Sequence, residues 1–262
     1  MRIYAILSLL LYVVILSCTD NSTTGPPTAE FELYLQDSPA DYDSVIVTIE
    51  EIAFRSTLYN FPDSTSGWNM IYNNGESFNL VSLRNGQREL LLKREIPVGY
   101  IGSLKITFGS SRIVVDSVSH DLNFPSGYSA ISEGIIQVSN DRNVSALVDI
   151  NLFSSILYNT DSSEYYFSPE FIFIDIDSTG GMFGYTNPSA DIFLFSVEDD
   201  DTTGFTTSEP DSNYFGFFGL PEGTYNLYLF PHDTLYGNWE IIDLHVLPDN
   251  VIELGTIDLP GG

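Results

Sequence analysis

The chain of 262 residues carries 36 acidic residues against 9 lysines and arginines, giving a formal net charge of −27 at pH 7. So negative a chain repels nucleic-acid phosphates and anionic lipid head groups, which argues against nucleic-acid binding and against electrostatic attachment to a membrane. The sequence is nonetheless 43% hydrophobic and 14% aromatic. It can therefore build folded cores, unlike a disordered acidic tail.

The N-terminal segment has the layout of a secretory signal peptide. Arg2 is followed by an apolar run from Ile3 to Leu16 and then by Cys18, the single cysteine of the chain. A basic start, an apolar middle and a small residue before the cut are typical of such peptides. About 20 apolar residues are needed to span a bilayer as a helix, so this run predicts a cleaved peptide and not a permanent anchor.

The four residues Ile15-Leu16-Ser17-Cys18 resemble the lipobox of bacterial lipoproteins. This resemblance implies that residues 1–17 are removed, that the Cys18 thiol receives a diacylglyceryl group, and that the new amine is acylated. Leu16 departs from the small residue more usual at its position. The alternative is an ordinary secreted or membrane-inserted protein with an incidental cysteine.

Residues 18–28 are polar and rich in Gly and Pro, which predicts a tether between the lipidated cysteine and the first folded domain. Thr19, and not Asp, follows the cysteine. The usual inner-membrane retention signal is then missing, so the expected location is the outer membrane, on either its periplasmic or its surface face. The lipid on Cys18 is the expected link to the membrane, because stable anchoring takes more than one acyl chain and no basic patch assists it.

From residue 29 to residue 177 the pattern is that of β-strands separated by turns. Asn85-Gly86, flanked by strand-like residues, predicts a tight hairpin, because both turn positions need positive φ. A short helical turn is expected within Phe153 to Tyr158. The expected strands are Phe31 to Leu35, Ser44 to Phe54, Phe78 to Leu83, Glu89 to Leu92, Gly102 to Phe108, Arg112 to Val118, His120 to Phe124, Gly134 to Val138, Val144 to Leu152 and Tyr165 to Ile176.

A second β unit is expected from residue 178 to residue 262, after the turn-forming Ser178-Thr179-Gly180-Gly181. Its seven expected strands lie near Met182 to Tyr185, Ala190 to Val197, Thr202 to Thr207, Tyr214 to Phe218, Gly223 to Phe230, Trp239 to Val246 and Val251 to Ile257. Many short strands with frequent turns predict an all-β protein with two antiparallel β-sandwich domains in tandem after the tether.

Residues from about 31 to 176 resemble DUF4382, a family of unknown function found in bacterial lipoproteins. The landmarks are Gln36-Asp37-Ser38-Pro39 after a strand, Ile96-Pro97-Val98-Gly99-Tyr100, Pro125-Ser126-Gly127, Val148-Asp149-Ile150-Asn151, and Tyr166 with Pro169. The departures are Ser38 and Val98 in place of Ala, and Asn151 in place of a second Asp. The last of these weakens a paired-carboxylate role on that strand.

Residues 180 to 259 resemble the carboxypeptidase-regulatory-like domain, a transthyretin-type sandwich. The resemblance rests mainly on the motif Gly219-Leu220-Pro221-Glu222-Gly223-Thr224-Tyr225. Within it, Pro221 and Gly223 predict a tight turn before an alternating strand. This resemblance implies a structural or binding accessory domain and supplies no catalytic residue.

The sequence shows no catalytic constellation, and the protein is expected not to be an enzyme. His120, His232 and His245 lie far apart, and no motif for a nucleophile, a zinc site or a phosphate loop is present. No cofactor is expected apart from Ca²⁺, a hard cation that prefers several oxygens. The calcium candidates are Asp175, Asp177, Asp199, Asp200 and Asp201, and solvated turns are the alternative interpretation of the same residues.

Aromatic side chains provide a second kind of candidate site. Exposed aromatic faces stack on apolar ligand surfaces, although strands favour Tyr and Phe for packing alone. The candidates are Trp68, Tyr165, Tyr166 and Trp239. The leading hypothesis is a lipid-anchored, non-enzymatic binding or structural module of the cell envelope, with a glycan or another envelope protein as its partner. The alternative is carbohydrate handling, by glycan binding or by glycoside hydrolysis.

Overall fold

The computed structural model describes residues 27–38, 42–56, 67–125, 127–198 and 201–262. Cys18, Asp199 and Asp200 lie outside the described residues. Within them the chain is almost entirely β, and two antiparallel sandwiches follow one another, as predicted. No helix among the described residues is both long and apolar enough to span a membrane.

The first domain packs two sheets against each other. One has the order β13-β10-β1-β5, and the other has the order β11-β12-β8-β7-β2-β6-β9, with β3 and β4 paired to β2. The bounds are β1 (Thr28–Ser38), β2 (Ser44–Ser56), β3 (Asn69–Tyr72), β4 (Glu76–Asn79), η1 (Leu80–Leu83), β5 (Glu89–Pro97), β6 (Gly99–Phe108), β7 (Ser111–Val115), β8 (Val118–Asn123), β9 (Ser129–Val138), β10 (Val144–Asn151), α1 (Leu152–Ser155), β11 (Ile156–Asn159), β12 (Glu164–Phe167) and β13 (Phe171–Asp175).

The second domain begins after the short linker η2 (Ile176–Ser178) and has two sheets, β17-β14-β20 and β16-β15-β18-β19. Its seven strands match the seven expected from the sequence. They are β14 (Thr179–Asn187), β15 (Ala190–Ser196), β16 (Asp201–Thr207), β17 (Tyr214–Pro221), β18 (Gly223–Pro231), β19 (Trp239–Val246) and β20 (Val251–Asp258).

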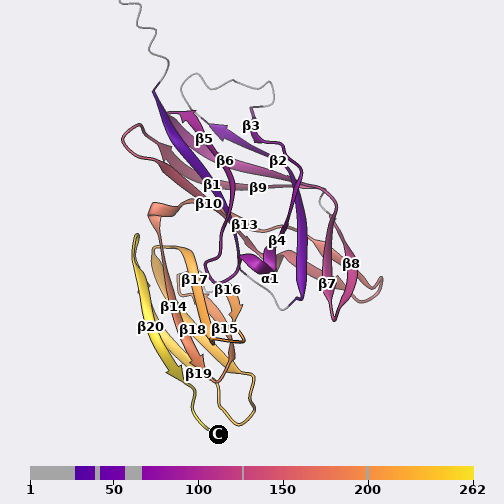
Figure 1. Cartoon of the computed structure of the whole chain (residues 1–262), viewed down its shortest axis with the longest axis vertical. Coiled ribbons are helices and arrows are strands. Elements are labelled where there is room, and N and C mark those ends of the chain that lie inside the picture. Colours follow the sequence, from indigo (N-terminus) through magenta and orange to yellow (C-terminus); the bar gives the residue numbers. More distant parts are fainter. Residues whose placement is uncertain (1–26, 39–41, 57–66, 126, 199–200) are drawn as a thin grey trace, which may run out of the picture.

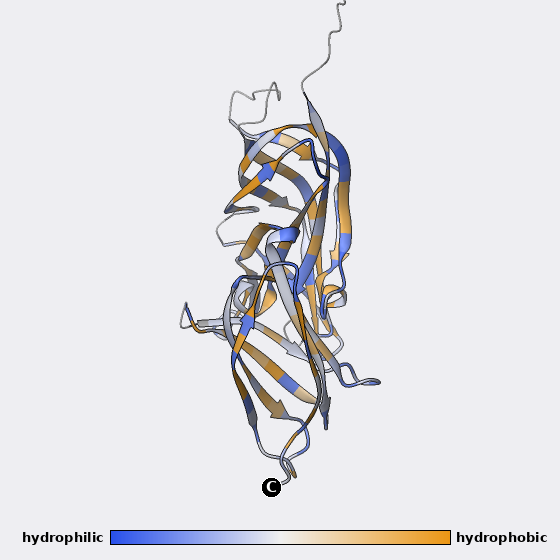
Figure 2. Ribbon diagram, turned by 90° about the vertical axis from the view of Figure 1, so that its left-hand side faces the viewer, coloured by the Kyte–Doolittle hydropathy of each residue, from blue (hydrophilic) through white to orange (hydrophobic). Residues whose placement is uncertain are grey.

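Each domain has its own hydrophobic core, and the cores follow from the period-two alternation of the strands. Along β1, Phe31, Leu33 and Leu35 are fully buried, whereas the intervening side chains face outward. The core of the second domain is built on residues such as Ile192 and Leu194 of β15. Figure 2 shows this alternation as orange and blue bands along the strands of both domains.

The strand pattern differs from the sequence prediction in several details, and two of its strands, β3 and β11, were not expected. Leu80–Leu83 form a 3-10 helix and do not extend the strand before them. The single strand expected from Tyr165 to Ile176 is two strands, β12 and β13, in different sheets, because Pro169 interrupts the ladder. The pairs β1–β10, β8–β12 and β14–β20 are parallel, within sheets that are otherwise antiparallel.

The two domains are stacked end to end (Figure 1). The start of β1 lies at one end of the molecule, and the C terminus lies at the opposite end. From the first domain the junction between the domains involves the turn after η1, α1, the end of β1, and β10. From the second domain it involves β15, β16 and β17.

Candidate functional site

The junction is organised by the turn Asn85-Gly86, which leads from η1 into β5. Both residues have positive φ, 55° and 83°, and the Gln87 N–H donates to the Arg84 carbonyl at 3.1 Å. The sequence therefore identified the turn correctly. The expected hairpin is wrong, however, because β4 pairs with β2 and β5 pairs with β1, so the turn crosses from one sheet to the other.

The Asn85 side chain is buried in the second domain and has partners for both its amide oxygen and its amide nitrogen. Its Oδ1 accepts hydrogen bonds from the Thr206 hydroxyl at 2.8 Å and from the Gly216 N–H at 3.2 Å. Its Nδ2 donates to Glu209 Oε1 at 2.7 Å. Arg84 donates to the same carboxylate, from Nε at 3.2 Å and from Nη2 at 3.4 Å. One turn of the first domain therefore binds three segments of the second.

Apolar contacts complete the junction. The ring of Phe153, on α1, lies 5.9 Å from the ring of Phe205 and 6.0 Å from that of Phe193. Leu147 of β10 is fully buried and lies against Gly219, where an added Cβ would overlap its side chain. The short helical turn expected within Phe153 to Tyr158 is present at Leu152–Ser155, whereas Ile156 to Tyr158 belong to strand β11.

A row of residues on the outer face of the first sheet contributes polar groups to the junction. Gln36 of β1, Asp149 of β10 and Ile172 of β13 are paired in register across three strands. Gln36 Nε2 donates to Asp149 Oδ2 at 3.2 Å and to the Phe218 carbonyl at 2.8 Å, while its Oε1 accepts from Arg88 Nε at 3.0 Å. Burial lowers the pKa of Arg88, and the nearby Asp149 carboxylate acts in the opposite direction.

Asp37, the next residue of β1, is a buried ionisable group. It is 2% exposed, and no residue in the part of the chain that the structure describes forms a hydrogen bond of normal geometry with either of its carboxyl oxygens. Burial raises its pKa well above the ordinary value, and the neighbouring Asp149 raises it further. The backbone N–H of Leu152 and the guanidinium of Arg84 act in the opposite direction but do not offset these effects. Burial of a carboxylate without a partner favours its protonated form.

Between the domains lies a cavity of about 220 Å³. Residues of both domains line it, and Glu170, Ile172 and Pro221 are exposed at its rim. The sequence analysis quoted Asp37 and Asp149 as landmarks of a family and Asn85 as a turn, but it did not place them in one site. One sequence signal could have pointed to this site. Asp37 continues the row of buried residues on β1 at a position where an apolar residue is normally expected.

The aromatic residues predicted from the sequence are not brought together. Trp68 lies under two cations, with Arg55 Cζ 4.4 Å and Lys105 Nζ 5.0 Å from the ring centroid. Trp239 is 48% exposed on β19 of the other domain. Tyr165 packs at 4.8 Å against Tyr158 of β11, whereas the hydroxyl of Tyr166 donates to Glu164 at 2.7 Å.

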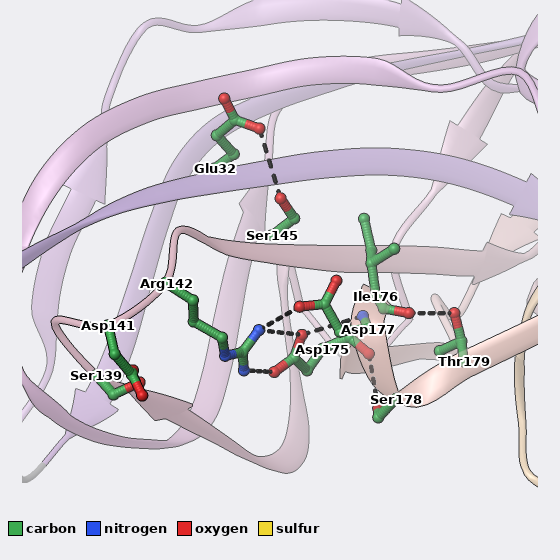
Figure 3. A network of polar contacts seen from close by, with 10 residues as sticks. All are labelled: Glu32, Ser139, Asp141, Arg142, Ser145, Asp175, Ile176, Asp177, Ser178 and Thr179. Atoms are coloured by element: carbon green, nitrogen blue, oxygen red, sulfur yellow. Dashed lines mark hydrogen bonds and ion pairs between the residues drawn. The ribbon is translucent and has the colours of Figure 1, made fainter. Parts of the chain in front are cut away.

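The calcium candidates Asp175 and Asp177 bind an arginine. The guanidinium of Arg142, which precedes β10, pairs with both carboxylates, and the Nη1 to Asp177 Oδ2 distance is 2.5 Å (Figure 3). Asp175 is the last residue of β13, and Asp177 lies in η2. Asp201 begins β16. Among the described residues, no three His, Cys, Asp or Glu side chains gather as a metal site.

These features define a two-domain, all-β protein whose sandwiches are joined by a buried polar junction. Residues 28–169, more than half of the chain, match the family described as "Domain of unknown function (DUF4382)". The chain belongs to this family. No curated protein matches the sequence.

Several solved pilin structures can be aligned with the chain at low similarity. The shaft pilin SpaA of Lactobacillus rhamnosus GG is 10% identical, with a TM-score of 0.26 over 91% of this chain and 98% of that one. The minor pilin GBS52 of Streptococcus agalactiae is 12% identical, with a TM-score of 0.25 over 88% and 96%. The major pilin BcpA of Bacillus cereus is 11% identical, with a TM-score of 0.25 over 90% and 71%. Likeness at this level carries no information on function.

Proposed function

We propose that this protein is a lipid-anchored outer-membrane protein whose two sandwiches act together as one non-enzymatic binding or structural module. The observation that most supports joint action of the two sandwiches is the junction. There the buried Asn85 side chain has partners on three segments of the second domain. Buried, satisfied polar contacts together with apolar packing favour a fixed arrangement of the domains over independent motion.

The lipid on Cys18 and the tether at residues 18–28 would attach the module at the end where β1 begins. The second domain then lies at the far end from the membrane, because the C terminus is opposite the start of β1 (Figure 1). The first domain would serve as a rigid stalk, and the second would be presented away from the bilayer. This arrangement suits a protein that presents the surface of its second domain to a binding partner.

The anchoring is tested by Cys18→Ala in a bacterial host, followed by detergent phase partitioning and intact-mass measurement. We expect the unmodified protein to enter the detergent phase with the mass of a triacylated chain beginning at Cys18. The variant should be released or left uncleaved. Ser22→Ala, in the expected tether, is the matched control and should behave as the wild type. A Cys18→Ala chain that is processed and still membrane-bound would contradict the proposal.

We further propose that the second domain is a carboxypeptidase-regulatory-like sandwich. Its seven strands and the turn between β17 and β18, which carries the motif from Gly219 to Tyr225, support this assignment. The Tyr225 hydroxyl donates to the Pro221 carbonyl at 3.0 Å and so fixes the turn. Such a domain would serve as a binding or structural accessory.

Glycan binding is the second candidate function, and exposed aromatic residues favour it. Tyr158 is 52% exposed and packs at 4.8 Å against Tyr165, which in turn lies 5.1 Å from His120. Rings of this kind can stack on the apolar face of a sugar. A glycan array probed with the detergent-solubilised protein tests this function. Selective binding should be lost in Tyr158→Ala and retained in Tyr236→Ala, and silence across the array would exclude this function for the glycans displayed.

A further inference from the structure

The chain contains the dipeptide Asn-Gly twice, as Asn74-Gly75 and as Asn85-Gly86. Asparagine is especially prone to deamidation when glycine follows it, because glycine has no Cβ to hinder attack by its own backbone nitrogen. The attacking nitrogen must reach the side-chain carbon of the asparagine, so the local fold decides whether the reaction proceeds. The structure places the two dipeptides in opposite surroundings.

The first dipeptide, Asn74-Gly75, is exposed. It lies in the connection between β3 and β4, two strands that both pair with β2, and all residues from Asn73 to Ser77 are exposed. In the part of the chain that the structure describes, a Cβ built on Gly75 would meet no atom within 4 Å beyond its chain neighbours. The Asn74 side chain makes a hydrogen bond to the Tyr72 hydroxyl. Breaking this contact lets the Asn74 amide turn toward the Gly75 nitrogen in open solvent.

The second dipeptide, Asn85-Gly86, is enclosed in the domain junction. Asn85 is 7% exposed, and its amide makes hydrogen bonds of 2.7 to 3.2 Å with three segments of the second domain. The Phe218 ring lies so close to Gly86 that an added Cβ would be 2.6 Å from it. The Asn85 amide can turn toward the Gly86 nitrogen only by breaking three hydrogen bonds in a packed interior, so the junction protects this asparagine.

We propose that Asn74 is a site of spontaneous deamidation, and that the domain junction protects Asn85 from the same reaction. The Gly75 backbone nitrogen loses its proton and bonds to the Asn74 side-chain carbon. The bond from that carbon to the amide nitrogen breaks, and ammonia leaves with the proton. Water then opens the resulting succinimide at one of its two carbonyls, to aspartate or to isoaspartate. This inference goes beyond the proposed function and does not depend on it.

The product changes the connection between β3 and β4. The Tyr72 hydroxyl donates to Glu76 Oε2 at 3.1 Å and contacts the Asn74 side chain as well, so a carboxylate at position 74 would lie near that of Glu76. The carboxylate cannot donate to Tyr72, and like charges repel. Isoaspartate also lengthens the backbone of this connection by one carbon. A long-lived protein would therefore gain negative charge at a point where β3 and β4 become less firmly held.

The test is storage of the full chain, as produced by a bacterial host and solubilised in detergent, in neutral buffer for several weeks. Samples are digested with pepsin in acid, and fragment-ion mass spectrometry follows each asparagine. We expect Asn74 to convert at least about tenfold faster than Asn85, because Asn85 must break more hydrogen bonds. Asn73 is the second internal control, since it is equally exposed but precedes an asparagine, and it should convert more slowly than Asn74. Conversion of Asn74 should accelerate as pH rises, because the attacking nitrogen must lose its proton.

Unfolding the protein in guanidinium chloride separates the effect of the fold from that of the sequence. There both dipeptides are exposed, and we expect Asn74 and Asn85 to convert at similar rates. Equal rates in the folded protein would overturn the proposal. So would an Asn74 that converts in the denaturant but stays intact in the folded protein.

Gly75→Ala tests the attacking group, because it adds a Cβ beside the nitrogen at a place with room for it. Asn74 should then convert as slowly as Asn73, whereas Asn85 should keep its wild-type rate. An unchanged rate at Asn74 in this variant would mean that water attacks the side chain directly, and the proposed route through Gly75 would be wrong.

Discussion

Asn85 and Glu209, 124 residues apart, are joined by a hydrogen bond of 2.7 Å from Nδ2 to Oε1. Glu209 also accepts from Arg84, and Asn85 also accepts from Thr206 and Gly216. This pair therefore connects a turn of the first domain with the loop between β16 and β17 of the second. The domains are coupled by a small number of buried polar contacts, and single substitutions can test that coupling.

Asn85→Ala should destabilise the protein and weaken the coupling between the domains. The change leaves the Thr206 hydroxyl and the Gly216 N–H without their acceptor, and each buried unsatisfied group costs about 1–3 kcal/mol. We expect the free energy of unfolding to fall by about 2–4 kcal/mol in urea titrations. Asn213→Ala is the control, because Asn213 has the same φ of 55° and reports backbone strain alone. Equal losses in the two variants would show that the Asn85 contacts contribute nothing.

Gly86→Ala should separate the domains without removing any polar group. A Cβ at Gly86 would lie 2.6 Å from the Phe218 ring, which is closer than side-chain packing permits. Gly75→Ala is the matched control, because Gly75 also has positive φ, 67°, but no atom lies within 4 Å of its added Cβ. Both substitutions should cause the backbone strain of an alanine at positive φ, but only Gly86→Ala should also clash with the Phe218 ring.

Small-angle scattering and limited proteolysis measure this difference. Gly86→Ala should show a larger radius of gyration and faster cleavage near η2, whereas Gly75→Ala should match the wild type in both. Scattering curves that coincide for all three proteins would mean that the junction adapts to the extra methyl group.

The strands could be predicted from the sequence because burial on one face imposes a period of two, and this period is visible in segments such as Ser44 to Phe54. The parallel pairing of β1 with β10 could not, since it joins residues more than a hundred positions apart. The Asn85-Gly86 signal predicted the backbone of a turn but not its partners, because local propensity does not identify Thr206 or Gly216. The Asp37 site was missed for the same reason.

The buried carboxyl of Asp37 should make stability depend on pH. Because its pKa in the folded protein is raised well above the ordinary value, the folded state holds a proton that the unfolded state releases near pH 4. Its contribution to stability is fully present below the unfolded pKa and is lost as pH rises through the folded pKa. The charged groups around it are Asp149, which raises this pKa, and Arg84, which lowers it.

Asp37→Asn isolates this effect from that of the other carboxyls. We expect the wild type to lose stability relative to the variant as pH rises from 4 to 8, and the difference in urea midpoints should follow a single titration. Asp243→Asn, on the exposed part of β19, is the control and should show no such trend. A difference between wild type and Asp37→Asn that does not change with pH would mean that Asp37 is ionised in the folded protein.

Arg142 decides whether Asp175 and Asp177 are available to calcium. Its guanidinium pairs with both carboxylates at the start of the linker (Figure 3), so we expect the wild type to melt at the same temperature in EDTA and in millimolar Ca²⁺. Arg142→Met removes the cation, keeps much of the packing volume, and leaves two carboxylates close together. Partly exposed ion pairs contribute about 0–1 kcal/mol, so the variant should be only slightly less stable in EDTA.

Because bound ligand stabilises the folded state, a rise in melting temperature with Ca²⁺ in Arg142→Met alone would show that the arginine excludes the ion. A rise in the wild type would show instead that calcium displaces the arginine or binds elsewhere.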